Sequence, residues 1–246
     1  MGDTELNVFP LSLQARSRSG LGLSGATGMT PTPDSEPAPL GKSVLVLVRH
    51  GESEWNRANR FTGWKDVGLT EEGMAEAHRA GAMLKETGQR FDCAFTSTLK
   101  RAHNTLDIIL DELGQGKLPT VKAAALNERD YGELVGINKE EARKRWGAEQ
   151  VHIWQRSYDI APPGGESLKD TAARVVPFFE KWIVPELQKG KSVILVAHGN
   201  SLRSLIMELD QLDPDEVMQV EIRTASPMIY RLNADGTVAE KRDLAA

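Results

Sequence analysis

The sequence predicts an α/β fold with a mostly parallel sheet that is covered by helices on both faces. Continuous apolar runs at Val44–Val48 and Val193–Ala197 are typical of strands buried on both sides. Between these runs, shorter strand-like segments alternate with amphipathic segments of helical length. Such alternation indicates right-handed strand–helix–strand crossovers, which build a parallel sheet.

The first half of the chain predicts two helices on either side of a strand at Phe91–Thr96. Thr70 followed by two glutamates is a typical helix start, with a capping residue and acids in the first turn. The expected apolar face of this helix consists of Met74, Ala77, Gly81 and Leu84. The next helical face consists of Leu99, Ala102, Leu106, Ile109, Leu110 and Leu113, and Gly114 ends it.

The middle of the chain predicts a short strand at Val121–Ala125, short helices at Asn138–Trp146 and Glu149–Trp154, and a turn at Pro162–Gly165. A long helix should follow, with a kink at Pro177. Its expected apolar face consists of Leu168, Ala172, Val175, Phe179, Trp182, Ile183 and Leu187.

The last predicted elements are a helix and a hairpin after the strand Val193–Ala197. The helix carries Leu202, Leu205, Ile206 and Leu209. Met228–Leu232 and Thr237–Glu240 predict an edge hairpin across the turn Asn233–Gly236.

Composition excludes several classes of protein. The chain has 30 Lys and Arg against 35 Asp and Glu, a net charge of −5, which argues against a general nucleic-acid binder. It has no run of eighteen apolar residues, so we expect no membrane-spanning helix. Its one cysteine, Cys93, cannot form an intramolecular disulfide and fits a reducing compartment such as the cytoplasm.

Residues 1–42 differ from the rest of the chain, because Gly, Pro and Ser supply 16 of these 42 residues and no apolar period persists. Such a segment buries too little apolar surface to offset its ordering entropy. We therefore expect a disordered N-terminal extension, with an organelle-targeting segment as the alternative, and one catalytic domain over residues 43–246.

Two strand ends look alike and indicate the site. Val44–Val48 leads into Arg49-His50-Gly51-Glu52, and Val193–Ala197 leads into His198-Gly199-Asn200. Carboxyl ends of parallel strands share one edge of the sheet, so the two imidazoles face each other if the strands are neighbours. The arginines of this region, which suit phosphate or carboxylate, are Arg49, Arg57, Arg60 and Arg101.

A histidine beside arginines can be a metal ligand, a general base or a nucleophile. The sequence has no HExxH metal motif, no GxSxG serine motif and no GxxxxGK[ST] phosphate loop. A phosphorylatable imidazole held by arginines therefore fits the residues best, without a metal.

The segment Leu47–Asn56, LVRHGESEWN, resembles the signature of the histidine phosphatase superfamily in its phosphoglycerate mutase branch. RHG alone is a weak motif, but the further blocks stand in family order and cover residues 43–246. These blocks are Asn59–Trp64, Leu69–Gly73, Thr96–Ala102, Leu126–Gly132 and Ala197–Arg203.

The resemblance implies roles position by position. It implies His50 as the nucleophile, with Arg49, Arg101 and His198 around the transferred phosphoryl group and Glu128 as the acid/base. The implied contacts to phosphate and substrate are Gly51, Glu52, Ser53, Glu54, Trp55, Asn56, Thr62 and Gly63. The rest of the implied binding shell is Arg129, Asp130, Tyr131, Lys139, Gln155, Arg156, Gly199 and Asn200.

The implied activity is a glycolytic and gluconeogenic isomerase that interconverts 2- and 3-phosphoglycerate through a phosphohistidine primed by 2,3-bisphosphoglycerate. The resemblance implies small phosphoglycerates as partners, without nucleic acid or membrane, and leaves a homodimer or higher homo-oligomer open. The alternatives are a phosphatase of the same fold acting on another small phosphomonoester, and a catalytically inactive binding module.

Two departures from the family pattern bear on the balance between mutase and phosphatase activity. Gln155 stands where many relatives carry the first arginine of an Arg-Arg pair. The chain also passes directly from Pro162-Pro163 to Gly164–Ser167, where many bacterial relatives have a longer insertion. Both departures predict a looser cover over the site.

Overall fold

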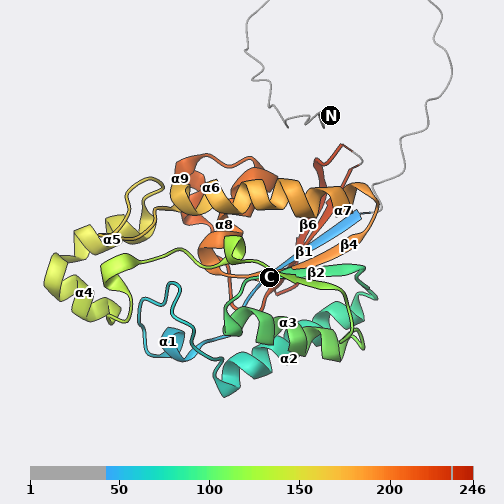
Figure 1. Cartoon of the computed structure of the whole chain (residues 1–246), viewed down its shortest axis with the longest axis horizontal. Helices are drawn as coiled ribbons and strands as arrows, with labels where there is room; N and C mark the ends of the chain where they lie inside the picture. The colour runs from blue at the N-terminus through green and yellow to red at the C-terminus, as the bar shows by residue number, and fades with distance from the viewer. Residues whose placement is uncertain (1–42, 234, 246) are drawn as a thin grey trace, which may run out of the picture. The chain divides into compact units, whose positions relative to one another are not determined.

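A six-stranded sheet in the order β3-β2-β4-β1-β5-β6 organises the computed structural model, which describes residues 43–233 and 235–245 (Figure 1). The parallel strands are β1 (Ser43–Arg49), β2 (Cys93–Thr96), β3 (Thr120–Lys122) and β4 (Ser192–Ala197). The antiparallel strands are β5 (Pro227–Leu232) and β6 (Val238–Asp243). The predicted fold class is confirmed, and the predicted disordered extension at 1–42 lies outside the described residues.

The register of β1 against β4 positions the site. Arg49 pairs with Ala197 at the carboxyl ends of these neighbouring strands. His50 and His198, each one residue further on, are therefore held side by side. The backbone N–H of His50 donates to the carbonyl of Ala197 at 3.0 Å and extends the ladder by one bond.

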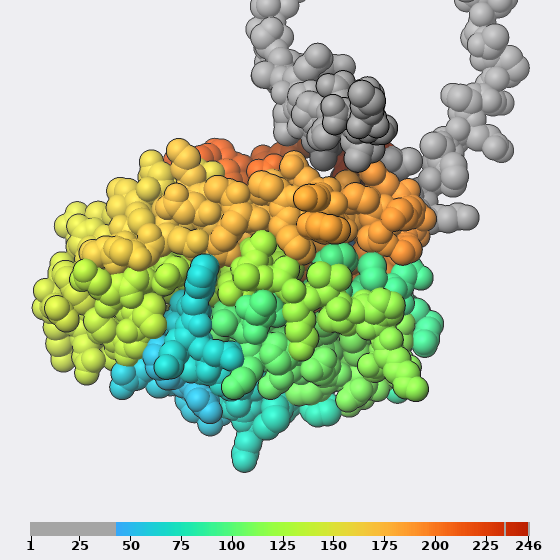
Figure 2. Space-filling view, viewed as in Figure 1, coloured from blue at the N-terminus to red at the C-terminus, as the bar shows by residue number. Residues whose placement is uncertain are grey.

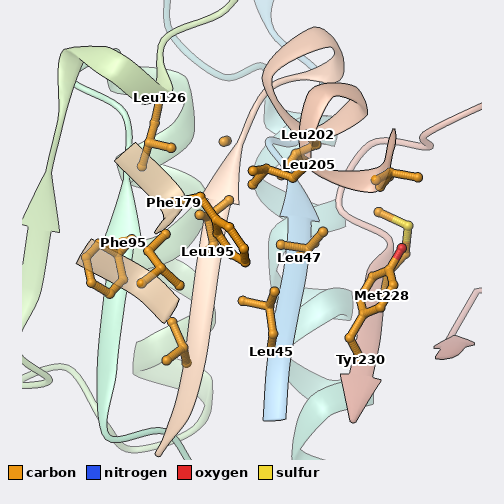
Figure 3. Packing of buried hydrophobic residues seen from close by; sticks show 14 of the residues in the cluster. Leu45, Leu47, Phe95, Leu126, Phe179, Leu195, Leu202, Leu205, Met228 and Tyr230 are labelled. Carbon is orange, nitrogen blue, oxygen red and sulfur yellow. The ribbon is translucent and has the colours of Figure 1, made fainter. Parts of the chain in front are cut away.

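Helices cover the two faces of the sheet (Figure 1). Val44, Val46 and Val48 of β1 belong to the apolar cluster under α2 (Glu71–Glu86) and α3 (Lys100–Glu112). Leu45 and Leu47 alternate with them and belong to the cluster on the opposite face (Figure 3). The helical segments that supply this second cluster are α6 (Leu168–Phe178), the π-helical turn η3 (Phe179–Ile183), α7 (Val184–Gln188) and α8 (Gly199–Asp210).

The smaller elements lie near the carboxyl ends of β1, β2 and β4. The helices α4 (Lys139–Trp146) and α5 (Ala148–Arg156) match the two short helices that the sequence predicts. The blue-to-cyan segment that contains the helix α1 (Glu54–Arg57) reaches the surface beside α4 and α3 (Figure 2). The elements that we did not predict are α1, η1 (Ala124–Leu126), η2 (Gly132–Leu134) and α9 (Pro214–Gln219).

Two residues expected on apolar faces are exposed, so those two predictions are wrong. Met74 is 41% exposed, because α2 turns Gly73 and Ala77 inward instead. Trp182 is 54% exposed, because the π-helical turn after Pro177 adds a residue to the turn and places Ile183 inward. The chain does not leave the helix at Pro177: it continues through η3 into α7.

The remaining predicted elements differ mainly in their bounds. The strand predicted at Val121–Ala125 is β3, and a 3₁₀ turn, η1 (Ala124–Leu126), follows it. The edge hairpin is present, with β6 running further than predicted. Within the part of the chain that the structure describes, no helix combines the length and apolar character needed to cross a membrane.

Candidate active site

The imidazole of His50 is fixed in one tautomer at the end of β1. Its Nδ1 lies 2.7 Å from the carbonyl oxygen of Gly51, an acceptor, so Nδ1 carries the proton and Nε2 keeps a lone pair. The side chain is buried yet lines a cavity at this edge of the sheet. Burial, then the charges of Arg101 and Arg49, hold the pKa of His50 well below 6.5. The ring is therefore neutral at physiological pH.

His198, at the N-terminus of α8, lies next to His50. The two ring centroids are 5.0 Å apart and the ring planes are inclined by 60°. Nε2 of His198 lies 2.7 Å from Oγ of Ser97, while Nδ1 is buried without a partner among the described residues. Burial, followed by the charge of Arg101, holds the pKa of His198 well below 6.5 as well.

A close backbone contact fixes the loop that follows His50. A Cβ atom on Gly51 would overlap the carbonyl oxygen of Gly73 in the first turn of α2. A Cβ atom on Gly73 would likewise overlap the carbonyl oxygen of Glu52. Only glycine at both positions lets the two segments touch this closely.

Two arginines beside His50 are anchored by backbone carbonyls. Arg101 donates from Nη1 to Lys65 O at 3.0 Å and from Nη2 to Gly63 O at 2.9 Å. Arg49 donates from Nη1 to Ile222 O at 2.9 Å. Burial lowers the pKa of Arg101 to about 10, so its guanidinium remains charged at neutral pH.

The carboxylate of Glu128 is held by one oxygen only. Oε1 accepts the backbone N–H groups of Arg129 at 2.8 Å and Asn200 at 3.0 Å. Oε2 has no hydrogen-bond partner among the described residues and lies over Gly199, beside the guanidinium of Arg49. One oxygen is therefore free for proton exchange.

Two side chains hold the backbone carbonyl of Glu128 by hydrogen bonds. Its carbonyl accepts from Nε1 of Trp64 at 2.6 Å and from Nη2 of Arg174 at 2.9 Å. Arg174 also donates to the carbonyls of Ala125 and Asn127 and pairs with Glu166 at 2.8 Å. The Arg174–Glu166 pair thus positions the loop that carries Glu128.

A cavity of about 170 Å³ opens at this edge of the sheet. It is lined by Arg49, His50, Asn56, Arg60, Phe61, Thr62, Gly63, Arg101, Glu128, Tyr131, Lys139, Gln155, Arg156, Gly199, Asn200 and Arg203. Six of these residues are Arg or Lys, whereas Glu128 is the only carboxylate among them. A chain of net charge −5 therefore concentrates cations at this cavity, which suits a ligand with more than one anionic group.

Several residues of the predicted binding shell do not line the cavity. Glu52 accepts from Thr70 at 2.7 Å and pairs with Arg57 at 3.0 Å, and Ser53 caps α1. Trp55 lies against Gly136. Gly51 and Glu54 also lie outside the lining. Most of this motif therefore shapes the loop around His50 and Asn56.

Arg129, Asp130 and His198 also lie outside the cavity lining. Arg129 is fully buried, with its guanidinium 4.7 Å from the ring centre of Tyr131 and Nη2 3.2 Å from the Tyr131 hydroxyl. The carboxylate of Asp130 accepts from the backbone N–H of Gly132. Arg129 and His198 therefore support residues that do line the cavity.

The predicted binding shell missed three lining residues, Arg60, Phe61 and Arg203. Arg60 belongs to the arginine cluster noted in the sequence, and Arg203 closes the block Ala197–Arg203. Arg203 lies one helical turn after Asn200, and this spacing could have placed it at the cavity.

Unpartnered nitrogen atoms gather around the site. Among the described residues, six buried side-chain nitrogens have no hydrogen-bond partner, and all belong to four arginines and His198. They are Nε of Arg49, Arg101, Arg129 and Arg203, Nη1 of Arg129 and Nδ1 of His198. Five of the six are guanidinium donors, and because buried donors without partners are costly, they favour negative charge nearby.

The chain belongs to the histidine phosphatase superfamily (branch 1), whose family model matches residues 45–243. Two relatives named 2,3-bisphosphoglycerate-dependent phosphoglycerate mutase cover nearly the same region. The protein of Xanthobacter autotrophicus is 59% identical over 207 residues, which is 84% of this chain and 100% of that protein. The protein of Rhodopseudomonas palustris is 61% identical over 202 residues, which is 82% of this chain and 98% of that protein.

Solved structures share the fold at lower identity. Bacillus stearothermophilus YhfR has a TM-score of 0.70 and 27% identity, over 80% of this chain and 94% of its own. Mycobacterial glucosyl-3-phosphoglycerate phosphatase complexed with VO3 has a TM-score of 0.69 and 26% identity, over 81% of this chain and 96% of its own.

Proposed function

We propose that this chain is a 2,3-bisphosphoglycerate-dependent phosphoglycerate mutase, which interconverts 2- and 3-phosphoglycerate through a phosphohistidine on His50. The observation that carries the proposal is a neutral His50 with a free Nε2 lone pair in a cavity lined by six cations. Relatives with this name, at 59–61% identity over nearly their whole length, support the particular reaction.

The cavity suits 2,3-bisphosphoglycerate as a primer. Two phosphates and a carboxylate need several cationic partners, which Arg60, Lys139 and Arg156 offer beyond the pair beside His50. The primer supplies the phosphoryl group that first phosphorylates His50. No metal is part of this proposal, because arginines can neutralise the phosphoryl oxygens.

His50 performs the transfer in the proposed mechanism. Its Nε2 lone pair attacks phosphorus, an N–P bond forms, and the ester P–O bond breaks. Arg49 and Arg101 neutralise the equatorial oxygens of the transferring group, and their carbonyl anchors hold them in place beforehand. The Nδ1–H of His50 stays bonded to Gly51 O, which stabilises the phosphorylated ring.

Glu128 exchanges the proton in the proposed mechanism. When a phosphoryl group leaves for His50, the protonated carboxyl gives its proton to the oxygen that is left behind. When the group returns to a hydroxyl on the neighbouring carbon, the carboxylate takes that proton. The free Oε2 can do both, because Oε1 remains fixed by two backbone N–H groups.

We also infer that the chain acts in the cytoplasm and that its substrates are small phosphoglycerates. A glycolytic reaction and a single half-buried cysteine support this inference.

Hydrolysis of another phosphomonoester is the second candidate function. It is favoured by the fold neighbour named as a phosphatase and by the short Pro162–Ser167 turn beside the site. In a phosphatase, water reaches the phosphohistidine, whereas in a mutase a hydroxyl of the bound substrate must reach it first.

One assay separates the two functions. Purified protein is incubated with 3-phosphoglycerate while 2,3-bisphosphoglycerate is titrated from zero, and 2-phosphoglycerate and free phosphate are followed by ³¹P nuclear magnetic resonance. We expect primer-stimulated isomerisation that exceeds phosphate release, with neither reaction in His50→Ala. If phosphate release is faster than isomerisation, the phosphatase function replaces the mutase function as our assignment.

A further inference from the structure

Arg203 makes two directed contacts at the wall of the cavity. Nη1 donates to Oδ1 of Asn200 at 2.9 Å, and Nη2 donates to the carbonyl of Val220 at 2.9 Å. A guanidinium has only N–H donors, so the Asn200 atom that faces it must be the carbonyl oxygen. Arg203 therefore fixes which way the carboxamide of Asn200 is turned.

The orientation of Asn200 determines what the hydroxyl of Tyr131 can do. With Oδ1 held by Arg203, Nδ2 of Asn200 faces the Tyr131 oxygen at 3.2 Å and donates to it. Nη2 of Arg129 donates to the same oxygen, also at 3.2 Å. Both lone pairs are then occupied, and the hydroxyl proton must be donated elsewhere.

The cavity is where that proton can go, because Tyr131, Asn200 and Arg203 all line it while Arg129 is buried beside the ring. If the carboxamide turned over, Oδ1 would accept the Tyr131 proton and withdraw it from the cavity. One arginine thus selects between a tyrosine that donates to a bound ligand and one that donates to its neighbour.

We propose that Arg203 is a positioning residue: by fixing the carboxamide of Asn200, it makes Tyr131 a hydrogen-bond donor to the anionic substrate. The kinetic part of this proposal rests on the proposed mutase function. The class of ligand is a phosphate or carboxylate oxygen, which has acceptors only and pairs with a phenolic O–H.

A double-mutant cycle tests the link between Arg203 and Tyr131. Arg203→Met removes the donors at similar length, and Tyr131→Phe removes the hydroxyl. We expect each single variant to raise KM for 3-phosphoglycerate about tenfold, as for one lost hydrogen bond to a charged group, with a smaller change in kcat. The double variant should be little worse than Tyr131→Phe alone. If the KM increases of the two single variants multiply in the double variant, the proposal is overturned.

Asn200→Asp provides a second variant that keeps Arg203 and the size of the side chain at position 200. Both oxygens of the introduced carboxylate accept hydrogen bonds, so Tyr131 would donate to that carboxylate even with Arg203 present. We expect a KM increase similar to that of Arg203→Met. An unchanged KM in Asn200→Asp would contradict the mechanism. Arg231→Met is the matched control, because Arg231 is exposed on β5 and pairs with Glu240 outside the cavity.

The ionisation of Tyr131 gives a readout that needs no substrate. Burial acts to raise the pKa of Tyr131, but the charge of Arg129 and the two N–H donors outweigh it and lower the pKa overall. The charge of Arg203 also interacts with Tyr131. Its other charged neighbours are Glu128, Arg156 and Arg129. In Arg203→Met we expect the pKa of Tyr131 to rise, because a nearby positive charge is lost and because Oδ1 of a turned Asn200 stabilises the neutral phenol.

The measurement is the ultraviolet absorbance of tyrosinate against pH, with Tyr131→Phe subtracted to isolate one tyrosine. A tyrosine titration that is identical in wild type and Arg203→Met would overturn the proposal even if the wild type is an active mutase. In an Asn200→Ala background no carboxamide can turn, so Arg203→Met should raise the pKa of Tyr131 less there, and an equal rise would mean that only the lost charge acts. A rise that depends on Asn200 in a protein that does not isomerise would refute the proposed function and leave the positioning role standing.

Discussion

The rings of His50 and His198 lie 5.0 Å apart, and each is hydrogen-bonded through a different nitrogen to a different neighbour. Nδ1 of His50 donates to Gly51, whereas Nε2 of His198 contacts Ser97. The two histidines are therefore not equivalent. Only His50 both lines the cavity and holds a lone pair on Nε2.

This difference predicts which histidine is phosphorylated. We expect an acid-labile phosphoenzyme with one phosphate per chain, measured with ³²P-labelled 2,3-bisphosphoglycerate. His50→Ala should abolish labelling, and His198→Ala should reduce its rate without moving the modified site. Full labelling of the His50 variant would refute the assignment.

The depressed pKa values of both histidines predict how stability changes with pH. The unfolded chain binds protons near pH 6.5, while the folded chain does not, so the free energy of unfolding falls as the pH drops below 6.5. Each buried histidine adds a slope of about 1.4 kcal/mol per pH unit within this window. Above pH 6.5 both states are neutral at these groups and their contribution is constant.

Urea unfolding at pH values on either side of 6.5 measures this effect. His198→Asn should remove one histidine's share of the slope, and the surface variant Arg231→Met should leave the slope unchanged. A wild-type stability that is flat through this window would mean that the rings are not held neutral.

Catalysis should need no metal, because the arginines supply the positive charge. A chelator should leave the rate unchanged, while vanadate should inhibit by adopting a five-coordinate geometry near His50 that resembles the transition state. Loss of activity in chelator, restored by zinc or manganese, would contradict this prediction.

Residues 1–42 should be dispensable, as their composition suggests. A chain that starts near Lys42 should keep the melting temperature and kcat of the full-length protein. The measurement is thermal unfolding followed by circular dichroism, beside the mutase assay. A large fall in either quantity would show that the segment stabilises the catalytic domain.

Arg156 should set the balance between isomerisation and hydrolysis. Its Nη1 is anchored on Met218 O at 3.0 Å, and it lines the cavity beside the uncharged Gln155. Arg156→Ala should lose a charge-assisted contact of roughly 1.5–3 kcal/mol and shorten the residence of the doubly phosphorylated ligand by about one to two decades. The ratio of phosphate release to isomerisation should therefore rise. Gln155→Arg, the reverse change, should lower it.

Much of the fold could be predicted because apolar periodicity is strong in this chain. The runs that became β1 and β4 were clear, and so were the helices α2 and α3 between them. Trp182 could not be placed, because a π-helical turn changes the side-chain phase without a recognisable sequence signal. Short elements such as α9 have too few residues to show a period.

The candidate site was predictable where a residue type directly indicates its chemistry. His50 and the arginines beside it are of this kind. Roles that depend on a third residue were not visible: Arg203 acts on Asn200, and Arg174 holds the backbone of Glu128 from a helix 46 residues away in sequence. The family resemblance implied Trp55 and Glu52 as ligand contacts, but the structure uses them to shape the loop.

The contact between Gly51 and Gly73 couples the loop after His50, the proposed nucleophile, to the helix α2. Because carbonyl and α-carbon meet there with no room for a methyl group, the loop after His50 cannot shift against α2. The helix offers no side chain to the cavity, yet any sliding of α2 along the sheet would carry the imidazole with it. The orientation of the His50 imidazole thus depends on how the whole of α2 packs, and a displacement of α2 would move the nitrogen that we propose as the nucleophile.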